Sequence, residues 1–458
     1  MSQRSLPRLM LAAAASGAGK TTVTCGVLRA LSRRSTRLAA FKCGPDYIDP
    51  MFHTRVIGVP SRNLDLFFTD PARTCALLAQ SSASADLAVI EGVMGFYDGL
   101  AGKSTEASSY DLARVTGTPV VLVVDCKGMS VSIAAQIKGF LGFRPDANIQ
   151  GVLLNRMSPM LYPAAKELIE RECGVRVAGY LPVLPQCALE SRHLGLVTAG
   201  EITDLRERLD VLADAMEQTV DFDLLEAIAA AAPPLLFDPI LLEPVGREIP
   251  IAVADDPAFC FYYRDSLDLL ERLGARLIPF SPLSDAAPPP EACGLLLGGG
   301  YPELYAPQLS ENLPMRRQLA AAVSGGLPTI AECGGFLYLH RRLQTDRGDW
   351  FEMAGVLPGD GFPTGKLSRF GYVTLTAQAN GMLCDAGGQI RAHEFHYWDS
   401  TACGDAFLAQ KPLRTVGWRC AHTSGSLYAG FPHVYFYSNI AFAQRFVTQC
   451  ARFGQKQP

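Results

Sequence analysis

The stretch that decides the fold is LMLAAAASGAGKTT at residues 9–22, an apolar run that leads into a glycine-rich loop. It approaches the phosphate-binding pattern G-x-x-x-x-G-K-[ST], with Ala14 in place of the first glycine. Small residues let successive backbone N–H groups point into one concavity, and the helix expected next adds its positive end. A strand, a nucleotide-binding loop and a helix are therefore predicted. A small-residue turn that binds nothing is the weaker alternative.

Particular side chains of this loop are expected to hold ATP. Lys20 can reach the β- and γ-phosphates, and the Thr21 hydroxyl can hold Mg²⁺. Asn155 ends a later apolar run, where it can hydrogen-bond the base of the nucleotide, although a purely structural role fits it nearly as well. The predicted ATP-binding residues are Ser16, Gly17, Ala18, Gly19, Lys20, Thr21, Thr22 and Asn155.

Apolar runs alternate with helix-like segments through most of the chain. A first series lies at residues 9–14, 37–41, 87–90, 119–124, 150–154 and 176–181. Its continuous Val, Leu, Ile and Ala content favours strands buried on both faces, as in a parallel sheet covered by helices. A second series lies at 249–254, 276–280, 294–297 and 328–331, and strand-rich sequence follows at 371–376, 389–395 and 426–431. The predicted fold class is α/β.

A proline-rich segment separates the two series. Residues 229–250 read AAAAPPLLFDPILLEPVGREIP and contain five prolines, which suits an extended linker better than a helix or a central strand. We expect two domains, each large enough to fold alone. The predicted boundaries are 1–230 for an ATP-binding domain, 231–247 for the linker and 248–450 for a second α/β domain.

Composition excludes several classes of protein. The 458 residues carry a net charge of −4 without a basic block, so neither nucleic acid nor a membrane surface is an expected partner. No apolar stretch is long enough to cross a bilayer. The 13 cysteines are scattered without a Cys-x-x-Cys pair, which argues against a disulfide scaffold and a zinc ribbon. A cytoplasmic protein is expected, and the sequence leaves a homodimer open.

Carboxylates follow two of the predicted strands. FKCGPDYIDP at 41–50 and IEGVMGFYDG at 90–99 lie on the same side of the sheet as the phosphate loop, because ligands bind beyond the carboxyl ends of parallel strands. Asp46, Asp49 and Glu91 can hold Mg²⁺ on the nucleotide phosphates. A turn or cap role is an even alternative for each aspartate and a weaker one for Glu91. The predicted metal ligands are Thr21, Asp46 and Glu91.

A cysteine stands between an apolar run and a helix-like run in LPTIAECGGFLYLHRRL at 327–343. A sharp strand-to-helix turn would expose Cys333 as a nucleophile in a strained conformation, and the helix N-terminus would favour the thiolate. The upstream loop contributes Gly299 and Gly300, whose N–H groups can join that of Gly334 in an oxyanion hole.

A cysteine nucleophile needs a base. His433 follows a late strand and precedes the last helix, and we predict that it is this base. His393 and His396, in HEFHY at 393–397, are three residues apart and lie in a strand-like segment, so a zinc site of the H-E-x-x-H kind is not expected there. Structural or substrate-lining roles fit them better.

Taken together, these segments resemble the cobyrinic acid a,c-diamide synthases of the cobalamin pathway. The matching stretches, in order, are ASGAGKTT, FKCGPDYIDP, SRNLD at 61–65, VIEGVMGFYDG, RHLGL at 192–196, LGGGYPEL, AECGG, RFGY at 369–372 and HEFHY. The resemblance implies a dethiobiotin-synthetase-like P-loop domain in front and a class I glutamine amidotransferase domain behind.

The resemblance also implies a carbon–nitrogen ligase. Glutamine would be hydrolysed at Cys333, ATP would phosphorylate the a- and c-acetate carboxylates of a corrinoid, and ammonia would displace phosphate from each acyl phosphate. Asp46, Asp49 and Glu91 would act in phosphoryl transfer, and Tyr47 and Ile48 would contact the corrinoid.

One position departs from the amidotransferase pattern. These enzymes usually carry a glutamate two residues after the catalytic histidine, but Tyr435 stands there. A Cys–His dyad, or a third member from elsewhere in the chain, is implied.

Other functions stay open from the sequence. The same chemistry would suit hydrogenobyrinic acid or a nickel sirohydrochlorin, while the GPDYIDP segment argues against the related cobyric acid synthases. A regulatory P-loop ATPase is the alternative of another class, although such proteins usually carry an early loop lysine where Ala15 and Ser16 stand and lack a cysteine elbow.

Overall fold

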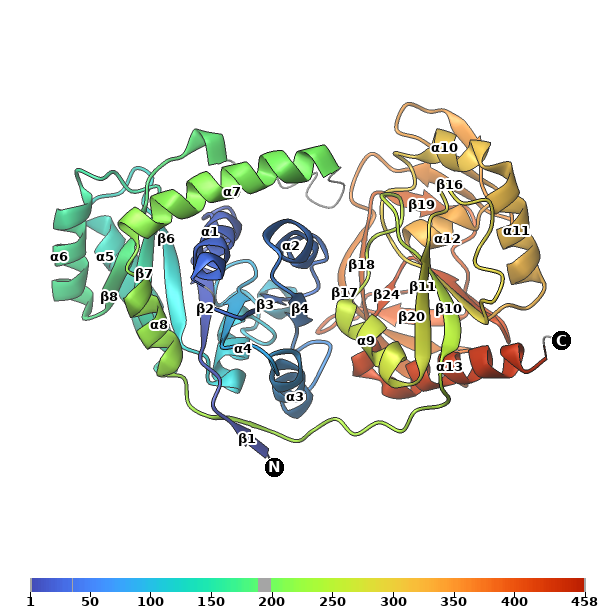
Figure 1. Cartoon of the computed structure of the whole chain (residues 1–458), viewed down its shortest axis with the longest axis horizontal. Coiled ribbons are helices and arrows are strands. Elements are labelled where there is room, and N and C mark those ends of the chain that lie inside the picture. Colours follow the sequence, from blue (N-terminus) through green and yellow to red (C-terminus); the bar gives the residue numbers. More distant parts are fainter. Residues whose placement is uncertain (1, 35, 188–198, 457–458) are drawn as a thin grey trace. The chain divides into compact units, whose positions relative to one another are not determined.

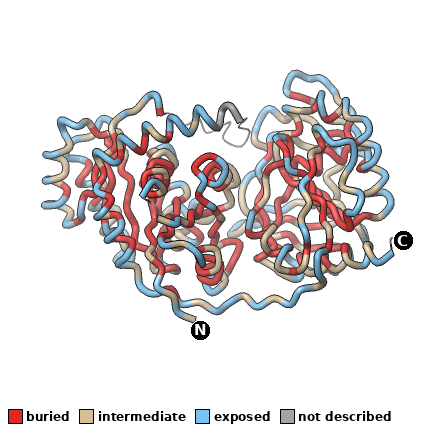
Figure 2. The backbone as a smooth tube through the Cα atoms, in the orientation of Figure 1, coloured by how far each residue is buried: buried red, intermediate tan, exposed pale blue. Residues whose placement is uncertain are grey.

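The structure is a computed structural model, and it describes residues 2–34, 36–187 and 199–456. The RHLGL motif at 192–196 lies outside the described residues. The chain divides into two compact units, Met1–Ile240 and Leu241–Pro458, and the division lies inside the proline-rich segment. In each unit the central strands of the parallel sheet are buried and the outer helix faces are exposed (Figure 2). Among the described helices, none combines the length and the apolar content that a membrane span requires.

The front unit is built on a seven-stranded sheet in the order β4-β3-β5-β2-β6-β7-β8, in which every neighbouring pair is parallel (Figure 1). The strands are β2 (Arg8–Ala13), β3 (Leu38–Cys43), β4 (Ser61–Leu64), β5 (Leu87–Glu91), β6 (Val120–Asp125), β7 (Ile149–Asn155) and β8 (Arg176–Leu181). β2 to β8 therefore end at one edge of the sheet, where the predicted strand-end residues gather.

Helices cover this sheet because its strands are apolar on both faces. One core cluster joins the sheet to α1 (Lys20–Arg33), α7 (Ala199–Thr219), α8 (Phe222–Ala230) and the turn formed by α2 (Ile48–Phe52) and the π-helix η1 (His53–Ile57). The remaining helices are α3 (Pro71–Ser81), α4 (Ser109–Thr116), α5 (Ser132–Phe143) and α6 (Tyr162–Cys173), together with the 3₁₀ turns η2 (Leu100–Gly102) and η3 (Pro185–Cys187).

Two elements of the front unit differ from the sequence expectation. β4 was not expected, because its four residues SRNL contain a single large apolar side chain, and it pairs only at the sheet edge. In the proline-rich segment, β9 (Leu235–Phe237) pairs antiparallel with β1 (Ser2–Arg4). The segment is therefore extended, but its first part is held to the N-terminus by strand pairing.

The rear unit contains three sheets. Its six-stranded sheet has the order β11-β10-β12-β13-β23-β22, parallel except for the last pair. These strands are β10 (Ile249–Ala254), β11 (Ala275–Phe280), β12 (Gly294–Leu297), β13 (Thr329–Glu332), β23 (Leu427–Gly430) and β22 (His422–Thr423). The helices are α9 (Arg264–Arg272), α10 (Ala306–Glu311), α11 (Leu313–Ser324), α12 (Gly334–Tyr338) and α13 (Ile440–Gly454), with the 3₁₀ turn η4 (Phe436–Ser438).

An antiparallel sheet of order β21-β20-β17-β18-β24 accounts for the strand-rich sequence. It comprises β17 (Arg369–Ala377), β18 (Gln389–His396), β20 (Phe407–Gln410), β21 (Gly417–Cys420) and β24 (His433–Val434). The third sheet holds β14 (Arg342–Gln344), β15 (Trp350–Glu352), β16 (Asp360–Pro363) and β19 (Trp398–Ser400).

The helix after the cysteine is shorter than its apolar run suggests. α12 ends at Tyr338, and β14 begins at Arg342. His340 lies at this junction, where its ring contacts the Phe336 carbonyl at 2.8 Å and the Ser400 hydroxyl at 2.6 Å. The first contact is to a residue of α12, and the second joins the end of the helix to β19.

Candidate phosphoryl-transfer and glutaminase sites

The phosphate loop connects the end of β2 to the first residue of α1, as the pattern predicts. Gly17 and Gly19 have φ of 77° and 89°, a left-handed region that favours glycine. A Cβ on Gly19 would lie 2.1 Å from the side-chain nitrogen of Asn155. That nitrogen donates to the Ala18 carbonyl at 2.9 Å, so Asn155 holds the loop backbone. Ser16 is exposed, and Thr22 is half-buried at the helix start.

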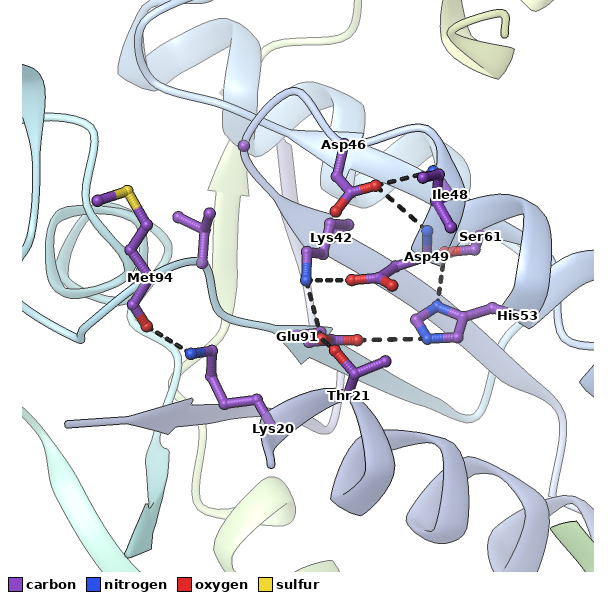
Figure 3. Close-up of polar contacts among 12 residues, drawn as sticks. Lys20, Thr21, Lys42, Asp46, Ile48, Asp49, His53, Ser61, Glu91 and Met94 are labelled. Carbon is purple, nitrogen blue, oxygen red and sulfur yellow. Dashed lines mark hydrogen bonds and ion pairs between the residues drawn. The ribbon is translucent and has the colours of Figure 1, made fainter. Parts of the chain in front are cut away.

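The two polar side chains that begin α1 point to different partners (Figure 3). The ammonium of Lys20 donates to the Met94 carbonyl and, at 3.3 Å, to that of Ala15. Burial, followed by repulsion from Lys42, lowers the pKa of Lys20 to about 8. The Thr21 hydroxyl donates to Oε1 of Glu91 at 2.8 Å. Lys20 is thus held over the loop, and Thr21 faces the carboxylate that ends β5.

Glu91 is the centre of a buried charge cluster. Oε1 accepts from the Lys42 ammonium at 2.8 Å, and Oε2 lies 3.4 Å from Nε2 of His53 (Figure 3). Burial opposes ionisation of Glu91, but the charge of Lys42 and the nearby His53 ring outweigh it and keep the pKa well below its usual range. The carboxylate is therefore a fixed negative charge with no exposed surface.

Lys42 connects Glu91 to Asp49, to which its ammonium also donates. Burial would lower the pKa of Lys42, but Glu91, Asp49 and Asp46 raise it above the usual range. Burial and the nearby Glu91 raise the pKa of Asp49. The cluster thus concentrates hard oxygen atoms around a cation at the carboxyl ends of the strands.

The GPDY turn is built around Asp46. Its Oδ1 accepts hydrogen bonds from the backbone N–H groups of Ile48, at 2.8 Å, and Asp49, at 3.3 Å. Both groups lie in the first turn of α2. Asn63 donates to the carbonyls of Gly44 and Asp46, so the SRNLD motif holds this turn in place. Tyr47 and Ile48 are half-buried, and Ile48 packs against the core.

Sequence reasoning missed Lys42 and His53. Lys42 lies inside a strand, where a lysine suggests an exposed position, but it is the register partner of Glu91 on the neighbouring strand. The available signal was that Lys42 and Glu91 each directly follow a predicted strand, 37–41 and 87–90, although the sequence leaves the register between those strands open. His53 is one helical turn beyond Asp49, and its other ring nitrogen contacts the Ser61 hydroxyl at 3.2 Å.

In the rear unit, Cys333 forms the predicted elbow at the carboxyl end of β13. Its φ is 48° and ψ is −101°, a strained conformation for a residue with a side chain. A Cβ on Gly335 would lie 2.2 Å from the Leu297 carbonyl oxygen, so only glycine allows the elbow to approach β12 this closely. The turn is thus built from β13, the elbow residue and the glycines that follow.

The glycine loop after β12 lies against this elbow. A Cβ on Gly334 would be 3.1 Å from the backbone nitrogen of Gly300, and one on Gly299 would be 2.3 Å from Cε1 of His433. The structure therefore places Gly299, Gly300, Gly334 and His433 close together beside Cys333. Whether these N–H groups bind an oxyanion stays a prediction.

His433 is buried in β24, beside His393 of β18. Its Nδ1 lies 3.6 Å from Oε2 of Glu332. Burial alone would lower the pKa of His433, but the nearby Cys333 and Glu332 side chains outweigh it and raise the pKa to about 10. Tyr435 turns away, and its hydroxyl donates to Asp265 at 3.3 Å.

His393 and His396 have surroundings of their own. The His396 ring stacks on Phe431 with 3.9 Å between centroids, and its Nδ1 contacts the Trp398 carbonyl. Burial lowers the pKa of His393 to about 3 and that of His396 to about 4. Across the described ranges, no three His, Cys, Asp or Glu side chains gather as metal ligands.

Comparisons with known proteins cover both units. Residues 9–196 match the CobQ/CobB/MinD/ParA nucleotide binding domain, and residues 250–440 match the CobB/CobQ-like glutamine amidotransferase domain. The cobyrinate a,c-diamide synthase of Salmonella typhimurium is 40% identical over 97% of this chain and 98% of its own. Those of Priestia megaterium and Listeria innocua are 38% and 41% identical, over 97% and 95% of this chain and 97% of their own lengths.

The chain belongs to the cobyrinate a,c-diamide synthase family. The predicted resemblance and the two-domain α/β fold class are confirmed. A cobyrinate a,c-diamide synthase of this family is a carbon–nitrogen ligase that takes its amide nitrogen from glutamine, and its P-loop domain binds a nucleotide. The regulatory ATPase without an amidotransferase domain is therefore the wrong class for this chain.

Proposed function

We propose that this enzyme amidates the a- and c-acetate carboxylates of cobyrinic acid, using ATP and glutamine. The observation that carries the proposal is the buried Thr21–Glu91–Lys42–Asp49 cluster beside the phosphate loop, in a chain that also contains a Cys333–His433 pair. The relatives that share nearly the whole chain are named for this diamide.

The proposed reaction of the front unit has two steps. A carboxylate oxygen of the substrate attacks the γ-phosphorus of ATP, which forms an acyl phosphate and releases ADP. Ammonia then attacks the acyl carbon, and inorganic phosphate leaves with the bonding electron pair. Such transfers depend mainly on positioning and on neutralising charge, which Lys20 and Lys42 would supply beside Glu91 and Asp49.

The residues of this site fit a magnesium ion. Glu91 is held ionised beside the Thr21 hydroxyl, and the contact of Lys42 with Glu91 and Asp49 shows that the site stabilises positive charge. Thr21 and Glu91 would hold Mg²⁺, and Asp46 would add its second oxygen. When bound, the ion would neutralise charge on the nucleotide phosphates.

The rear unit would release the ammonia. The Cys333 thiolate attacks the side-chain amide carbon of glutamine, and the departing nitrogen takes a proton from His433 and leaves as ammonia. Water, deprotonated by His433, then hydrolyses the thioester to glutamate. Gly299, Gly300 and Gly334 would stabilise the tetrahedral oxyanions with their N–H groups.

A substrate panel tests the proposal. The enzyme is incubated with ATP, Mg²⁺, glutamine and one of three acids: cobyrinic acid, hydrogenobyrinic acid or nickel sirohydrochlorin. The products are identified by mass spectrometry. We expect cobyrinic acid to gain two amides. Amidation of hydrogenobyrinic acid or nickel sirohydrochlorin in its place would assign another tetrapyrrole substrate to the same chemistry.

A further inference from the structure

Glu332 stands between the two halves of the proposed glutaminase site. It is the last residue of β13 and directly precedes Cys333. Its Oε1 accepts from the backbone N–H of Val434 at 2.9 Å, and its Oε2 lies 3.6 Å from Nδ1 of His433. One carboxylate therefore contacts both the ring of His433 and the backbone immediately after it.

Amidotransferases usually carry a glutamate two residues after the catalytic histidine, but this chain has no glutamate at that position. Tyr435 stands two residues after His433, and its hydroxyl is bound to Asp265 of α9. The ring of Tyr435 packs edge-on against Tyr263. The carboxylate that reaches the imidazole comes instead from the strand that carries the nucleophile.

We propose that Glu332 is the positioning residue of the glutaminase site, which orients His433 through Nδ1 and leaves Nε2 for Cys333. This inference rests on the proposed glutaminase function of Cys333 and His433. A carboxylate on one ring nitrogen fixes the tautomer and stabilises the imidazolium that forms when the other nitrogen takes a proton.

The surroundings of Glu332 strengthen its effect on His433. The side chain of Glu332 is 14% exposed and that of His433 is 3% exposed. Glu332 borders a pocket lined largely by apolar side chains, among them Leu297, Ile330 and Val434. A charge interaction with little water nearby is stronger than one at the surface. The raised pKa of His433 agrees with this arrangement.

Other titratable groups also face His433. The charge of His433 contributes to lowering the pKa values of three residues of β18, His393, Glu394 and His396. His393 and His396 are neutral at neutral pH because burial lowers their pKa values. Glu394 is fully buried, and burial raises its pKa to about 7. It is a second nearby carboxylate, but the ion-pair contact with Nδ1 of His433 is made by Glu332.

Glu394 therefore provides a matched control. Above pH 7, Glu332→Gln and Glu394→Gln each remove one negative charge near His433, but only the first replaces the group that contacts Nδ1. In Glu332→Gln the amide oxygen can still accept from Val434, while the amide N–H₂ would favour the tautomer with a bare Nδ1. Glu332→Asp keeps the charge at a shorter reach.

The experiment measures glutamine hydrolysis over pH 6–10 for the full-length enzyme and the three variants. We expect Glu332→Gln to lower kcat by about 100-fold, the scale for losing an effective general base, with KM changed less than about threefold. Glu332→Asp should retain more kcat than Glu332→Gln, and Glu394→Gln should stay within about threefold of the wild type. Amidation driven by ammonium salts should be unchanged in all, which shows that the front unit is intact, and urea unfolding of each variant checks the fold of the rear unit.

A second readout does not depend on activity. The ¹⁵N signals of the His433 ring, assigned with His433→Asn, are followed against pH. We expect the titration midpoint to fall by at least about one pH unit in Glu332→Gln and to change less in Glu394→Gln. Unchanged kcat and an unchanged midpoint in Glu332→Gln would overturn the inference. If Cys333→Ala still hydrolyses glutamine, the proposed glutaminase is wrong, whereas the midpoint still decides whether Glu332 controls His433.

Discussion

At the scale of single residues, buried charge decides where this chain does chemistry. Glu91 has no exposed surface, yet it stays ionised because Lys42 and His53 contact it. Burying charges costs free energy unless each has a partner, so such a cluster is weak evidence for stability and stronger evidence for function. This is the reason to test Glu91 first.

Glu91→Gln keeps the shape of the side chain and removes its charge. We expect it to lose amidation even with abundant ammonia, while glutamine hydrolysis continues because Cys333 lies in the other unit. It should also lower the free energy of unfolding by roughly 3 kcal/mol, since Lys42 loses a buried partner. Urea unfolding and product mass measure the two effects.

Lys42→Met combined with Glu91→Gln is the control for stability. It removes both members of the ion pair, so we expect it to recover part of the lost stability and to remain inactive. Amidation by the double variant at the wild-type rate would contradict the role given to the cluster.

Glu394 gives a pH-dependent prediction. Burial raises its pKa from 4.5 to about 7, so ionisation in the folded state costs stability. The cost is absent below pH 4.5, grows as the pH rises towards 7 and is complete above it. Glu394→Gln should therefore stabilise the protein at pH 8, by at most roughly 3 kcal/mol, but not at pH 4.

Asp360 is the control, because its ionisation changes the stability of the fold in the opposite direction from that of Glu394. Hydrogen bonds from Arg341 and Arg342 lower its pKa to about 2, so its ionised form stabilises the fold above its usual pKa of 3.8, and this is lost as the pH falls towards 2. Asp360→Asn should destabilise the protein at pH 8. Thermal unfolding at both pH values distinguishes the variants, and a Glu394→Gln protein less stable than wild type at pH 8 would contradict the account.

Sequence reasoning proposed some residues of the candidate sites but not the side chains that contact them. Lys20, Thr21 and Cys333 belong to local patterns in which spacing alone indicates the geometry. Lys42 acts across neighbouring strands, so its role depends on register, which a single sequence does not show. Glu332 reaches His433 from a strand of a different sheet, so its role depends on how the two sheets pack. His53 is brought to Glu91 by a turn of π-helix that no pattern marked.

At the scale of elements, the cysteine elbow stores strain. The positive φ of Cys333 costs on the order of 1–3 kcal/mol for a residue with a side chain. We expect Cys333→Gly to be about 1 kcal/mol more stable than Cys333→Ala, although both lack the nucleophile. Urea unfolding of the two variants measures the difference.

Cys450 supplies the matched comparison, because it lies buried inside α13. There the order should reverse, with Cys450→Gly less stable than Cys450→Ala by about 1 kcal/mol. If Cys333→Ala is more stable than Cys333→Gly, as expected for the Cys450 variants, the elbow is not strained.

Elements with a continuous apolar run were predicted to within a residue or two, since burial on both faces leaves a strong signal. β8 has the predicted bounds, and β2 and β6 differ by one residue at each end. The predictions that differed concern elements shaped by tertiary contacts. β4 is a polar edge strand, and α12 ends where His340 contacts a neighbouring strand.

At the scale of the whole molecule, the two proposed chemistries lie in separate units of one chain. Each unit builds its site at the carboxyl ends of parallel strands, the phosphate loop after β2 and the elbow after β13. The central claim is that the rear unit makes ammonia and the front unit uses it on an activated carboxylate. Variants in one unit should therefore leave the chemistry of the other intact.

The most direct measurement compares wild type, Cys333→Ala and Glu91→Gln with cobyrinic acid and ATP, supplied with either glutamine or ammonium chloride. Diamide is read by mass, and glutamate and ADP are followed in the same reactions. We predict that Cys333→Ala makes diamide from ammonium but not from glutamine, while Glu91→Gln releases glutamate and makes diamide from neither. A folded Cys333→Ala protein that loses amidation from glutamine and from ammonium equally would contradict the account. So would ADP release by the wild type that stays the same whether or not a tetrapyrrole acid is added.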